Sequence, residues 1–412
     1  MEYKEPDFRI KENIIMPKLL QINVSANWGS HGRIAEQIGL LAMQRGWEVF
    51  MAYGRQDGGS ALNTIHIGGK GSVAWHGVES LLLDNQGLAS RIDTKMLVRQ
   101  IKEIQPDIIH LHNIHGYYLN YKILFEFLKD YGKPVVWTLH DCWAFTGHCT
   151  HFEYDGCFKW KEQCHDCVNR KAYPKSLFFD RSRRNFELKK KLFSSLPNLT
   201  IVSVSEWLDR YVKQSFLGNA KTEVIHNGID VDVFSPQQHI LRKGYNILGV
   251  ASNWKMLKGL PDFIRLRDLL PADYNITLVG LTQKEINALP DGITGICRTN
   301  NIGELVNVYC NADVLVNPTY EDNYPTINLE AQACGTPVVT YRTGGSAESI
   351  TNKTGIVVEC GNIEKIADAV RNICNGSTMI TREECRRHAE RTHDWHNCFK
   401  KYIDLYNQLI SQ

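Results

Sequence analysis

Short apolar runs alternate with helical stretches along this chain in two series, and this alternation limits the fold more than any other feature. The first series has its apolar runs at 19–24, 47–53, 107–112, 134–140 and 201–205. The second series, which begins near residue 245, has them at 247–250, 276–280, 314–317 and 337–340. Such alternation predicts parallel sheets covered by helices on both faces. We therefore expect an α/β protein with two doubly wound domains.

Composition narrows the class of protein further. The 47 Lys and Arg residues nearly balance the 45 Asp and Glu residues, so the net charge of +2 does not favour a nucleic-acid partner. No apolar run approaches the roughly 18 residues that a membrane span requires. The polar extension before residue 17 has no apolar segment typical of a secretory signal. We expect a cytoplasmic protein.

The first strand is followed by the loop Asn27–Arg33, which contains Gly29 and Gly32. Glycines allow the backbone to approach a ligand, and ligands of open α/β sheets bind beyond the carboxyl ends of the strands. The third glycine of the dinucleotide fingerprint is absent, so a nicotinamide cofactor is not favoured. A tight turn without any ligand is the alternative.

Histidines follow two further strands at the same edge of the predicted sheet. His110 and His112 end one strand, and His140 with Asp141 ends the next. A histidine beside a carboxylate can act as an acid, a base or a hydrogen-bond donor to a sugar. Buried histidines that hydrogen-bond to the backbone are the alternative, chiefly for His110 and His112.

A carboxylate motif follows the strand that ends at Asn317. Asp322 precedes a predicted helix that begins near Thr326, and Glu330 lies about one turn inside it. Free N–H groups of the first helical turn can bind phosphate, and a carboxylate can hold a ribose diol. By itself the motif also fits a helix-capping acid and a solvated glutamate.

Several motifs together resemble a known family. Asp322-x7-Glu330 is followed by Ala331–Val339, and the chain also carries Trp137–Asp141 and His226–Asp230 with Phe234. These segments resemble the retaining nucleotide-sugar glycosyltransferases of family 4, which have the GT-B fold. An Asp at the first acidic position, with Asn323 and Pro325, resembles the branch that makes capsule and colanic-acid-type polysaccharides.

The resemblance implies two Rossmann-like domains that face each other across a cleft. We expect an acceptor-side domain at 17–235 with a Cys-rich insertion at 142–170, and a nucleotide-sugar-binding domain at 236–390. We expect a helix at 391–412 to return to the first domain. The implied activity is transfer of a sugar to a glycan or lipid-linked acceptor in surface polysaccharide biosynthesis. A sugar-nucleotide epimerase and a non-catalytic nucleotide- or glycan-binding protein remain alternatives.

The resemblance also assigns roles to residues of this sequence. It implies catalytic roles for His140, Asp322 and Lys258. The implied donor-binding residues are Gly29, Gly32, Asn253, Lys258, Asn323, Thr326, Ile327 and Glu330. Asn253 stands where the family places an arginine on the donor diphosphate, and Lys255 could compensate for it. We expect a uridine rather than a guanosine diphosphate donor, and no metal for transfer, so we interpret Asp230-Val231-Asp232 as structural.

Five of the twelve cysteines fall between residues 142 and 167. Four of them have a spacing that could bind a structural zinc ion, and they are Cys149, Cys157, Cys164 and Cys167. The first gap is wider than the usual two to four residues, so free thiols on an ordered loop, or a redox role, are the alternatives.

A basic stretch follows this insertion. It contains Arg181, Arg183, Arg184, Lys189, Lys190 and Lys191, with aromatic and aliphatic residues between them. One hypothesis is peripheral contact with anionic lipid at the inner face of a membrane. The alternative is an ordinary solvated basic face on a helix whose apolar side packs on the protein.

Overall fold

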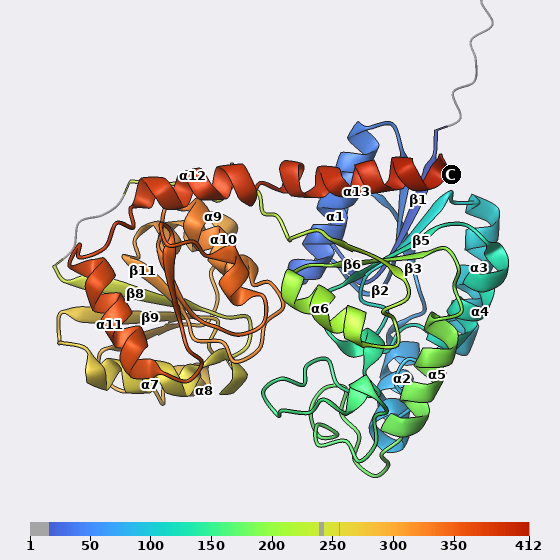
Figure 1. The fold of residues 1–412 in the computed structure, drawn as a ribbon, viewed down its shortest axis with the longest axis horizontal. Coiled ribbons are helices and arrows are strands. Elements are labelled where there is room, and N and C mark those ends of the chain that lie inside the picture. The colour runs from blue at the N-terminus through green and yellow to red at the C-terminus, as the bar shows by residue number, and fades with distance from the viewer. Residues whose placement is uncertain (1–15, 239–242, 255, 412) are drawn as a thin grey trace, which may run out of the picture.

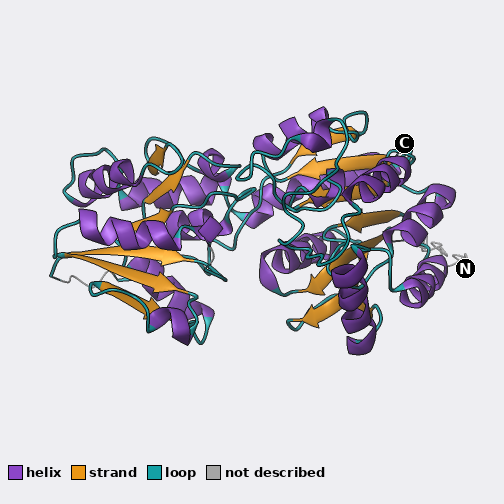
Figure 2. Cartoon of the chain, turned by 90° about the horizontal axis from the view of Figure 1, so that it is seen from below, coloured by secondary structure: helices purple, strands orange, loops and turns teal. Residues whose placement is uncertain are grey.

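The computed structural model describes residues 16–238, 243–254 and 256–411, and it contains two parallel sheets, each lying between helices (Figures 1 and 2). The first sheet has seven strands in the order β3-β2-β1-β4-β5-β6-β7. Their bounds are β1 Lys18–Ala26, β2 Glu48–Asp57, β3 Asn63–His66, β4 Ile108–Leu111, β5 Val135–Leu139, β6 Leu199–Ser203 and β7 Lys221–Val224. Its helices are α1 Gly29–Gln44, α2 Lys70–Leu83, α3 Arg91–Ile104, α4 Tyr121–Tyr131, α5 Ser182–Phe193 and α6 Glu206–Gln214.

The second sheet has six strands in the order β10-β9-β8-β11-β12-β13. Their bounds are β8 Tyr245–Val250, β9 Tyr274–Val279, β10 Ile293–Ile296, β11 Val314–Asn317, β12 Val338–Tyr341 and β13 Gly355–Val358. The helices after β8 are α7 Leu260–Leu269, α8 Gln283–Ile286, α9 Ile302–Cys310, α10 Thr326–Ala333, α11 Ile363–Cys374, α12 Arg382–Thr392 and α13 Trp395–Ile410. Strand order reverses beside β1 and beside β8, so each sheet has a switch point where ligands of such folds bind.

The strands that the sequence predicted are the central ones, and this agreement has a physical reason. Central strands of a parallel sheet are covered on both faces and consist of continuous apolar runs. The strands that sequence analysis missed are β3, β7, β10 and β13, which lie at the two edges of each sheet. β3 and β7 are largely exposed, so they lack the apolar pattern that marks a buried strand.

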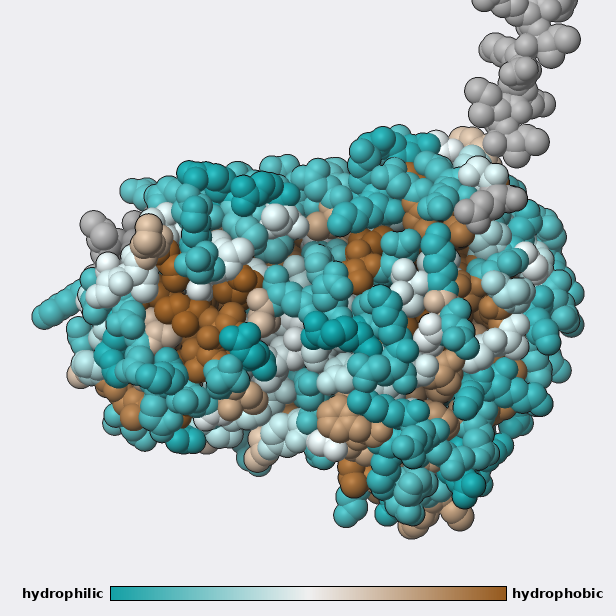
Figure 3. Space-filling view, viewed as in Figure 1, coloured by the Kyte–Doolittle hydropathy of each residue, from teal (hydrophilic) through white to brown (hydrophobic). Residues whose placement is uncertain are grey.

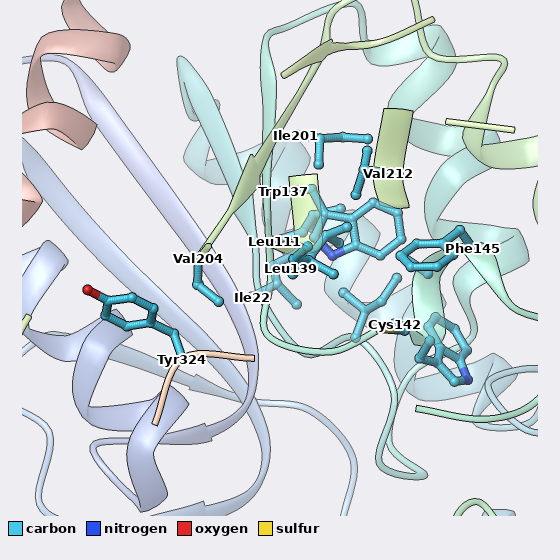
Figure 4. Packing of buried hydrophobic residues seen from close by; sticks show 14 of the residues in the cluster. Ile22, Leu111, Trp137, Leu139, Cys142, Phe145, Ile201, Val204, Val212 and Tyr324 are labelled. Atoms are coloured by element: carbon cyan, nitrogen blue, oxygen red, sulfur yellow. The ribbon is translucent and has the colours of Figure 1, made fainter. Parts of the chain in front are cut away.

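The core of the first domain is centred on Trp137 of β5. Its indole is fully buried, and the Nε1 atom donates a hydrogen bond to the His112 carbonyl at 3.0 Å. Figure 4 shows Trp137 among side chains of β4, β5, β6 and α6, with Tyr324 of the second domain near Val204. The hydrophobic cluster therefore continues from the first domain to the loop that precedes α10.

The C-terminal helix α13 lies against the first domain, while α12 lies against the second (Figure 1). Trp395, Phe399, Tyr402 and Tyr406 of α13 pack in one hydrophobic cluster with residues of β1, α1 and β2. The chain thus crosses between the domains twice. In the space-filling view the two domains abut, and the largest hydrophobic patch lies over the second domain on the left, with smaller patches over the first domain (Figure 3).

Between β5 and α5 the chain forms a long insertion whose only helical segments in the structure are two single 3₁₀ turns, η1 Trp143–Phe145 and η2 Lys159–Lys161. Its aromatic side chains compensate for this lack of regular structure. Phe145, Phe152 and Trp160 are fully buried and contact one another with ring centroids 4.9–6.2 Å apart. Among the described residues, no helix is long and apolar enough to cross a membrane.

Candidate active site

The candidate site lies where the carboxyl ends of the two sheets face each other. The loop after β11 reaches the first domain, because the Asn323 amide donates a hydrogen bond to the backbone carbonyl of His140, which follows β5. Asn227 makes a second link by donating to the Tyr324 carbonyl at 3.0 Å. These contacts place the carboxylate motif of the second domain beside the histidines of the first.

Lys258 and Asp322 form an ion pair at the centre of this region. The Lys258 Nζ atom lies 2.6 Å from Oδ2 of Asp322, and both side chains retain some solvent exposure. Lys258 ends the 3₁₀ turn η3 Met256–Lys258, and Gly259 follows it with φ +73°. A Cβ atom at Gly259 would lie only 2.4 Å from the Pro318 carbonyl oxygen, so the Lys-Gly pair holds the η3 turn tightly against the β11 loop.

Glu330 is the second carboxylate of the motif and is half-buried. It lies one turn into α10 and accepts a hydrogen bond from the Tyr309 hydroxyl at 2.8 Å. Burial raises the pKa of Glu330, while the Tyr309 hydrogen bond and the positive charge of Arg33 on α1 oppose that rise. Arg33 belongs to the first domain, so both domains contribute charge around this carboxylate.

The N-terminus of α10 also faces this region. Pro325 precedes the helix and gives no side-chain cap. Thr326 and Ile327 begin the first turn, where the backbone N–H groups have no partner within the helix. A helix end of this kind favours an anion, so α10, Lys258 and Arg33 together make one end of the site electropositive.

The histidines of the first domain form a buried hydrogen-bonded cluster. His112 Nδ1 lies 3.2 Å from Nε2 of His140, and His110 Nε2 lies 2.8 Å from the Thr138 hydroxyl. Burial, reinforced by the neighbouring histidines, lowers the pKa values of His110, His112 and His140 well below the ordinary value. His110 and His112 are thus buried histidines, as the alternative expected, but they hydrogen-bond to side chains rather than to the backbone. His140 lies at the domain interface and is half-buried.

The glycine loop after β1 packs closely on its own strand. Gly29 has φ +70°, and a Cβ atom at Gly32 would lie 3.0 Å from the Ser25 hydroxyl. His31 lies between these glycines, and its ring centroid is 6.1 Å from that of His140. Trp28 lies under the guanidinium of Arg298 from the second domain, 5.4 Å from the ring centroid. The loop thus faces both His140 and the second domain.

Not every residue that the sequence predicted for the site contacts the other site residues in the structure. Asn253 is exposed, and Lys255 lies outside the described residues. Asp230 accepts hydrogen bonds from the backbone N–H groups of Asp232 and Val233, both at 3.0 Å, so it closes a turn, in keeping with the structural interpretation of Asp230-Val231-Asp232.

Sequence analysis also missed several residues of the site. His31 and Arg33 lie in the glycine loop that the sequence indicated, but neither was assigned a role. Tyr309 of α9 carries no motif that could have indicated it. Tyr154 of the Cys-rich insertion was missed as well, and its backbone N–H donates to Glu321 at 2.8 Å.

The four cysteines of the predicted zinc site come together around one small cavity. Cys149, Cys157, Cys164 and Cys167 all line it. Gly147 N–H donates a hydrogen bond to Cys164 Sγ at 3.2 Å, and none of the four forms a disulfide. Within the described parts of the chain, no group of three or more His, Cys, Asp or Glu side chains is arranged to hold a metal ion. The zinc site stays a prediction.

The basic stretch forms α5 only in part, and one of its six cations is not on the surface. Lys189 is fully buried, with Nζ 3.4 Å from the centroid of the Trp143 ring and 2.7 Å from the Trp143 carbonyl. The prediction of a six-cation solvated face is therefore wrong for Lys189, because a cation over an aromatic ring and bonded to carbonyls can be buried. Phe186 and Phe193 pack in the core, whereas Phe178 and Phe179 precede the helix and are exposed.

Comparison with known families gives this arrangement its biochemical class. Residues 32–233 match the family described as Glycosyltransferase Family 4, and residues 245–375 match Glycosyl transferases group 1. The chain is a GT-B glycosyltransferase. Both matches agree with the family that the sequence motifs resemble. The second match contains Lys258, Asp322 and Glu330.

Individual relatives agree with this class. A protein named as a colanic acid biosynthesis glycosyl transferase, WcaC of Escherichia coli (strain K12), is 23% identical over 95% of this chain and 100% of its own length. Sucrose-phosphate synthase from Thermosynechococcus elongatus shares the fold with a TM-score of 0.70 and 16% identity, covering 96% of this chain and 99% of that chain. HepE of Anabaena in complex with UDP superposes with a TM-score of 0.66 and 13% identity, covering 95% of this chain and all of the other.

Proposed function

We propose that this glycosyltransferase moves a sugar from a uridine diphosphate donor to a glycan or lipid-linked acceptor, with retention of the anomeric configuration, in surface polysaccharide biosynthesis. The observation that carries the proposal is the convergence of the Lys258–Asp322 pair, the start of α10 and Glu330 opposite His140. The homology to a colanic acid biosynthesis protein supports the pathway, and the UDP complex of a protein with the same fold supports the donor.

Each group of the site has a distinct task in this proposal. The diphosphate binds at the N-terminus of α10 and beside Lys258, where positive charge stabilises it as it leaves. Glu330 accepts hydrogen bonds from the ribose hydroxyls, and Tyr309 fixes its orientation. His140 contacts a hydroxyl of the transferred sugar, and Asp322 orients that sugar.

The same geometry favours front-face transfer over a covalent glycosyl intermediate. Asp322 is held 2.6 Å from Lys258, so its charge is already engaged by a cation. Glu330 is bound to Tyr309 and lies one turn inside α10. In front-face transfer the bond between the anomeric carbon and the phosphate oxygen breaks while the acceptor oxygen bonds to the same carbon. The departing phosphate oxygen takes the proton of the acceptor hydroxyl. Lys258 and the helix dipole neutralise the diphosphate charge, so transfer requires no metal.

Donor binding is tested by a thermal-shift panel of nucleotide sugars against the wild type, Glu330→Gln and Glu364→Gln. A ligand at 100 times its Kd stabilises the folded state by about 2.7 kcal/mol, which raises the midpoint by several degrees. We expect one uridine diphosphate sugar to shift the wild type and the exposed control Glu364→Gln, but not Glu330→Gln. Glutamine keeps an acceptor for Tyr309 while removing the charge that holds the diol. An equal shift in Glu330→Gln contradicts the assignment.

We also propose that the protein binds an anionic lipid surface and meets its acceptor there. Trp75 and Val78 lie on the outer face of α2 and are 66% and 44% exposed, and Phe178 and Phe179 are 67% and 50% exposed. The two segments adjoin, because Leu177 N–H donates to the Leu81 carbonyl at 2.8 Å. Exposed cations flank them at Lys70, Lys171, Lys175 and Arg183. Aromatic side chains with surrounding cations favour a lipid interface.

Vesicle flotation tests this surface. We expect the wild type and Met379→Ser, an exposed control in the second domain, to float with phosphatidylglycerol vesicles and not with phosphatidylcholine vesicles. The double variant Phe178→Ser/Phe179→Ser should stay in solution. Reversal of Arg183, Arg184, Lys190 and Lys191, with the buried Lys189 retained, should also abolish flotation. Flotation of either variant like the wild type contradicts lipid contact through this surface.

A further inference from the structure

The hydrogen bonds behind His140 determine where its proton sits. The chain of contacts begins at Gln21, a fully buried side chain of β1. Its Nε2 atom donates to the Ala35 carbonyl at 2.8 Å. A carbonyl oxygen can only accept, so the amide nitrogen of Gln21 must face Ala35 and Oε1 must face the other way. The opposite orientation would bring two oxygen atoms together at this distance.

Oε1 of Gln21 in turn fixes the proton on His112. It lies 3.0 Å from His112 Nε2, and it can only accept, so Nε2 carries the proton. His112 is buried and, because its pKa is well below the ordinary value, it is neutral and carries a single proton. Its Nδ1 atom is therefore a hydrogen-bond acceptor.

The same argument passes to His140. His112 Nδ1 lies 3.2 Å from His140 Nε2, so Nε2 of His140 must donate. His140 is also neutral, because burial and its histidine neighbours lower its pKa. Its Nδ1 atom then has a free lone pair, and the described residues provide no hydrogen bond to it. The ring can accept a hydrogen bond at this atom and cannot donate one.

His31 is held in the same tautomer, with its proton on Nε2, by a separate set of contacts. Asn23 accepts the Asn113 N–H at Oδ1, at 3.2 Å, and donates to the Ser25 carbonyl from Nδ2, at 2.8 Å. Nδ2 also lies 3.2 Å from His31 Nδ1, which must accept. Burial lowers the pKa of His31 to about 4, so this ring is neutral and carries its proton on Nε2. His31 therefore presents a donor on a ring whose centroid is 6.1 Å from that of His140.

We propose that Gln21 and His112 are positioning residues that hold His140 with its proton on Nε2, so that Nδ1 accepts a hydrogen bond from a hydroxyl of the bound sugar. His31, oriented by Asn23, supplies the matching donor. A hydroxyl both donates and accepts one hydrogen bond, so a donor ring and an acceptor ring together recognise it. A protonated or wrongly tautomeric His140 would present N–H in place of the acceptor. The sugar part of this inference rests on the proposed function.

The test reads the tautomer directly. Protein labelled with ¹⁵N-histidine is examined near pH 7 by long-range ¹H–¹⁵N correlation, without substrate, and the His140 signals are identified by their loss in His140→Gln. We expect wild-type His140 to carry its proton on Nε2. His112→Leu, which offers no acceptor, should give a mixture of tautomers, and His112→Gln should restore the wild-type state through its amide oxygen. Gln21→Met should disturb His112 first.

Activity provides the second readout. In His112→Leu, kcat/KM should fall about tenfold, the size of one hydrogen bond to a reacting substrate, and His112→Gln should recover to within about threefold. Circular dichroism and thermal midpoints establish that both variants fold. A wild-type His140 with its proton on Nδ1 overturns the proposal, as does an unchanged tautomer and kcat/KM in His112→Leu. If the wild type releases nucleotide from no donor, the proposed function fails, whereas the spectrum still decides the positioning of His140.

Discussion

Replacing Lys258 by methionine separates its structural role from its role in transfer. The Lys258–Asp322 pair has an N–O distance of 2.6 Å, but the two side chains are 36% and 22% exposed. Pairs with this much solvent contact contribute about 0.2–1 kcal/mol to stability, so the variant should unfold within a few degrees of the wild type. Loss of a group that stabilises charge in the transition state costs much more, about 2.7–4 kcal/mol. We therefore expect kcat to fall by about 10²–10³.

The assay is release of nucleotide from the donor identified by thermal shift, measured under saturating donor. Lys365→Met is the matched control, because its Nζ atom pairs with Asp368 at 3.4 Å in an exposed position away from the site. The control should keep wild-type kcat and stability. A Lys258→Met enzyme with kcat within about threefold of the wild type would refute the assignment of Lys258 to the diphosphate. A large loss of stability would refute the treatment of the pair as weak.

Three further predictions concern acid stability, the cysteines and metals. Burial lowers the pKa of His76 to about 4, against 6.5 when unfolded, so the unfolded chain binds more protons between these values. The free energy of unfolding should therefore decline as pH falls from 6.5 to 4, and His76→Gln should flatten this decline by up to about 1.4 kcal/mol per pH unit in denaturant titrations. For a zinc site at the four clustered cysteines, plasma emission spectroscopy should find one zinc ion per chain, and the double variant Cys164→Ser/Cys167→Ser should lose it. A wild type that contains no metal and whose thiols react freely would contradict the zinc site. Nucleotide release should be unchanged in EDTA, whereas a loss restored by manganese would contradict transfer without metal.

The sequence predicts those features whose pattern lies within one segment of the chain, and it does not predict contacts between distant segments. Central strands and α13 carry strong apolar patterns, so the alternation alone indicated two doubly wound sheets. The edge strands β3 and β7 are exposed and carry no such pattern. The Lys258-Gly259 dipeptide and the Asp322-x7-Glu330 motif were visible in the sequence. The ion pair between Lys258 and Asp322, which are 64 residues apart, was not.

Tertiary contacts account for the remaining differences. Lys189 belongs to a basic run in the sequence, and only the fold places Trp143 beneath it. Arg33 of α1 and Tyr309 of α9 both act on Glu330, although they are far from it in the sequence. The tautomers of His31 and His140 depend on amides in β1, which no spacing along the chain could indicate.

The central claim is retaining transfer from a nucleotide sugar, and the configuration of the released sugar tests it most directly. The enzyme is incubated with the donor that it binds, and ¹H NMR follows the first sugar set free, before mutarotation mixes its anomers. From an α-linked donor, the account predicts that the α-anomer appears first together with free uridine diphosphate. Initial release of the β-anomer would contradict retention, and a sugar that changes while still linked to the nucleotide would contradict transfer itself.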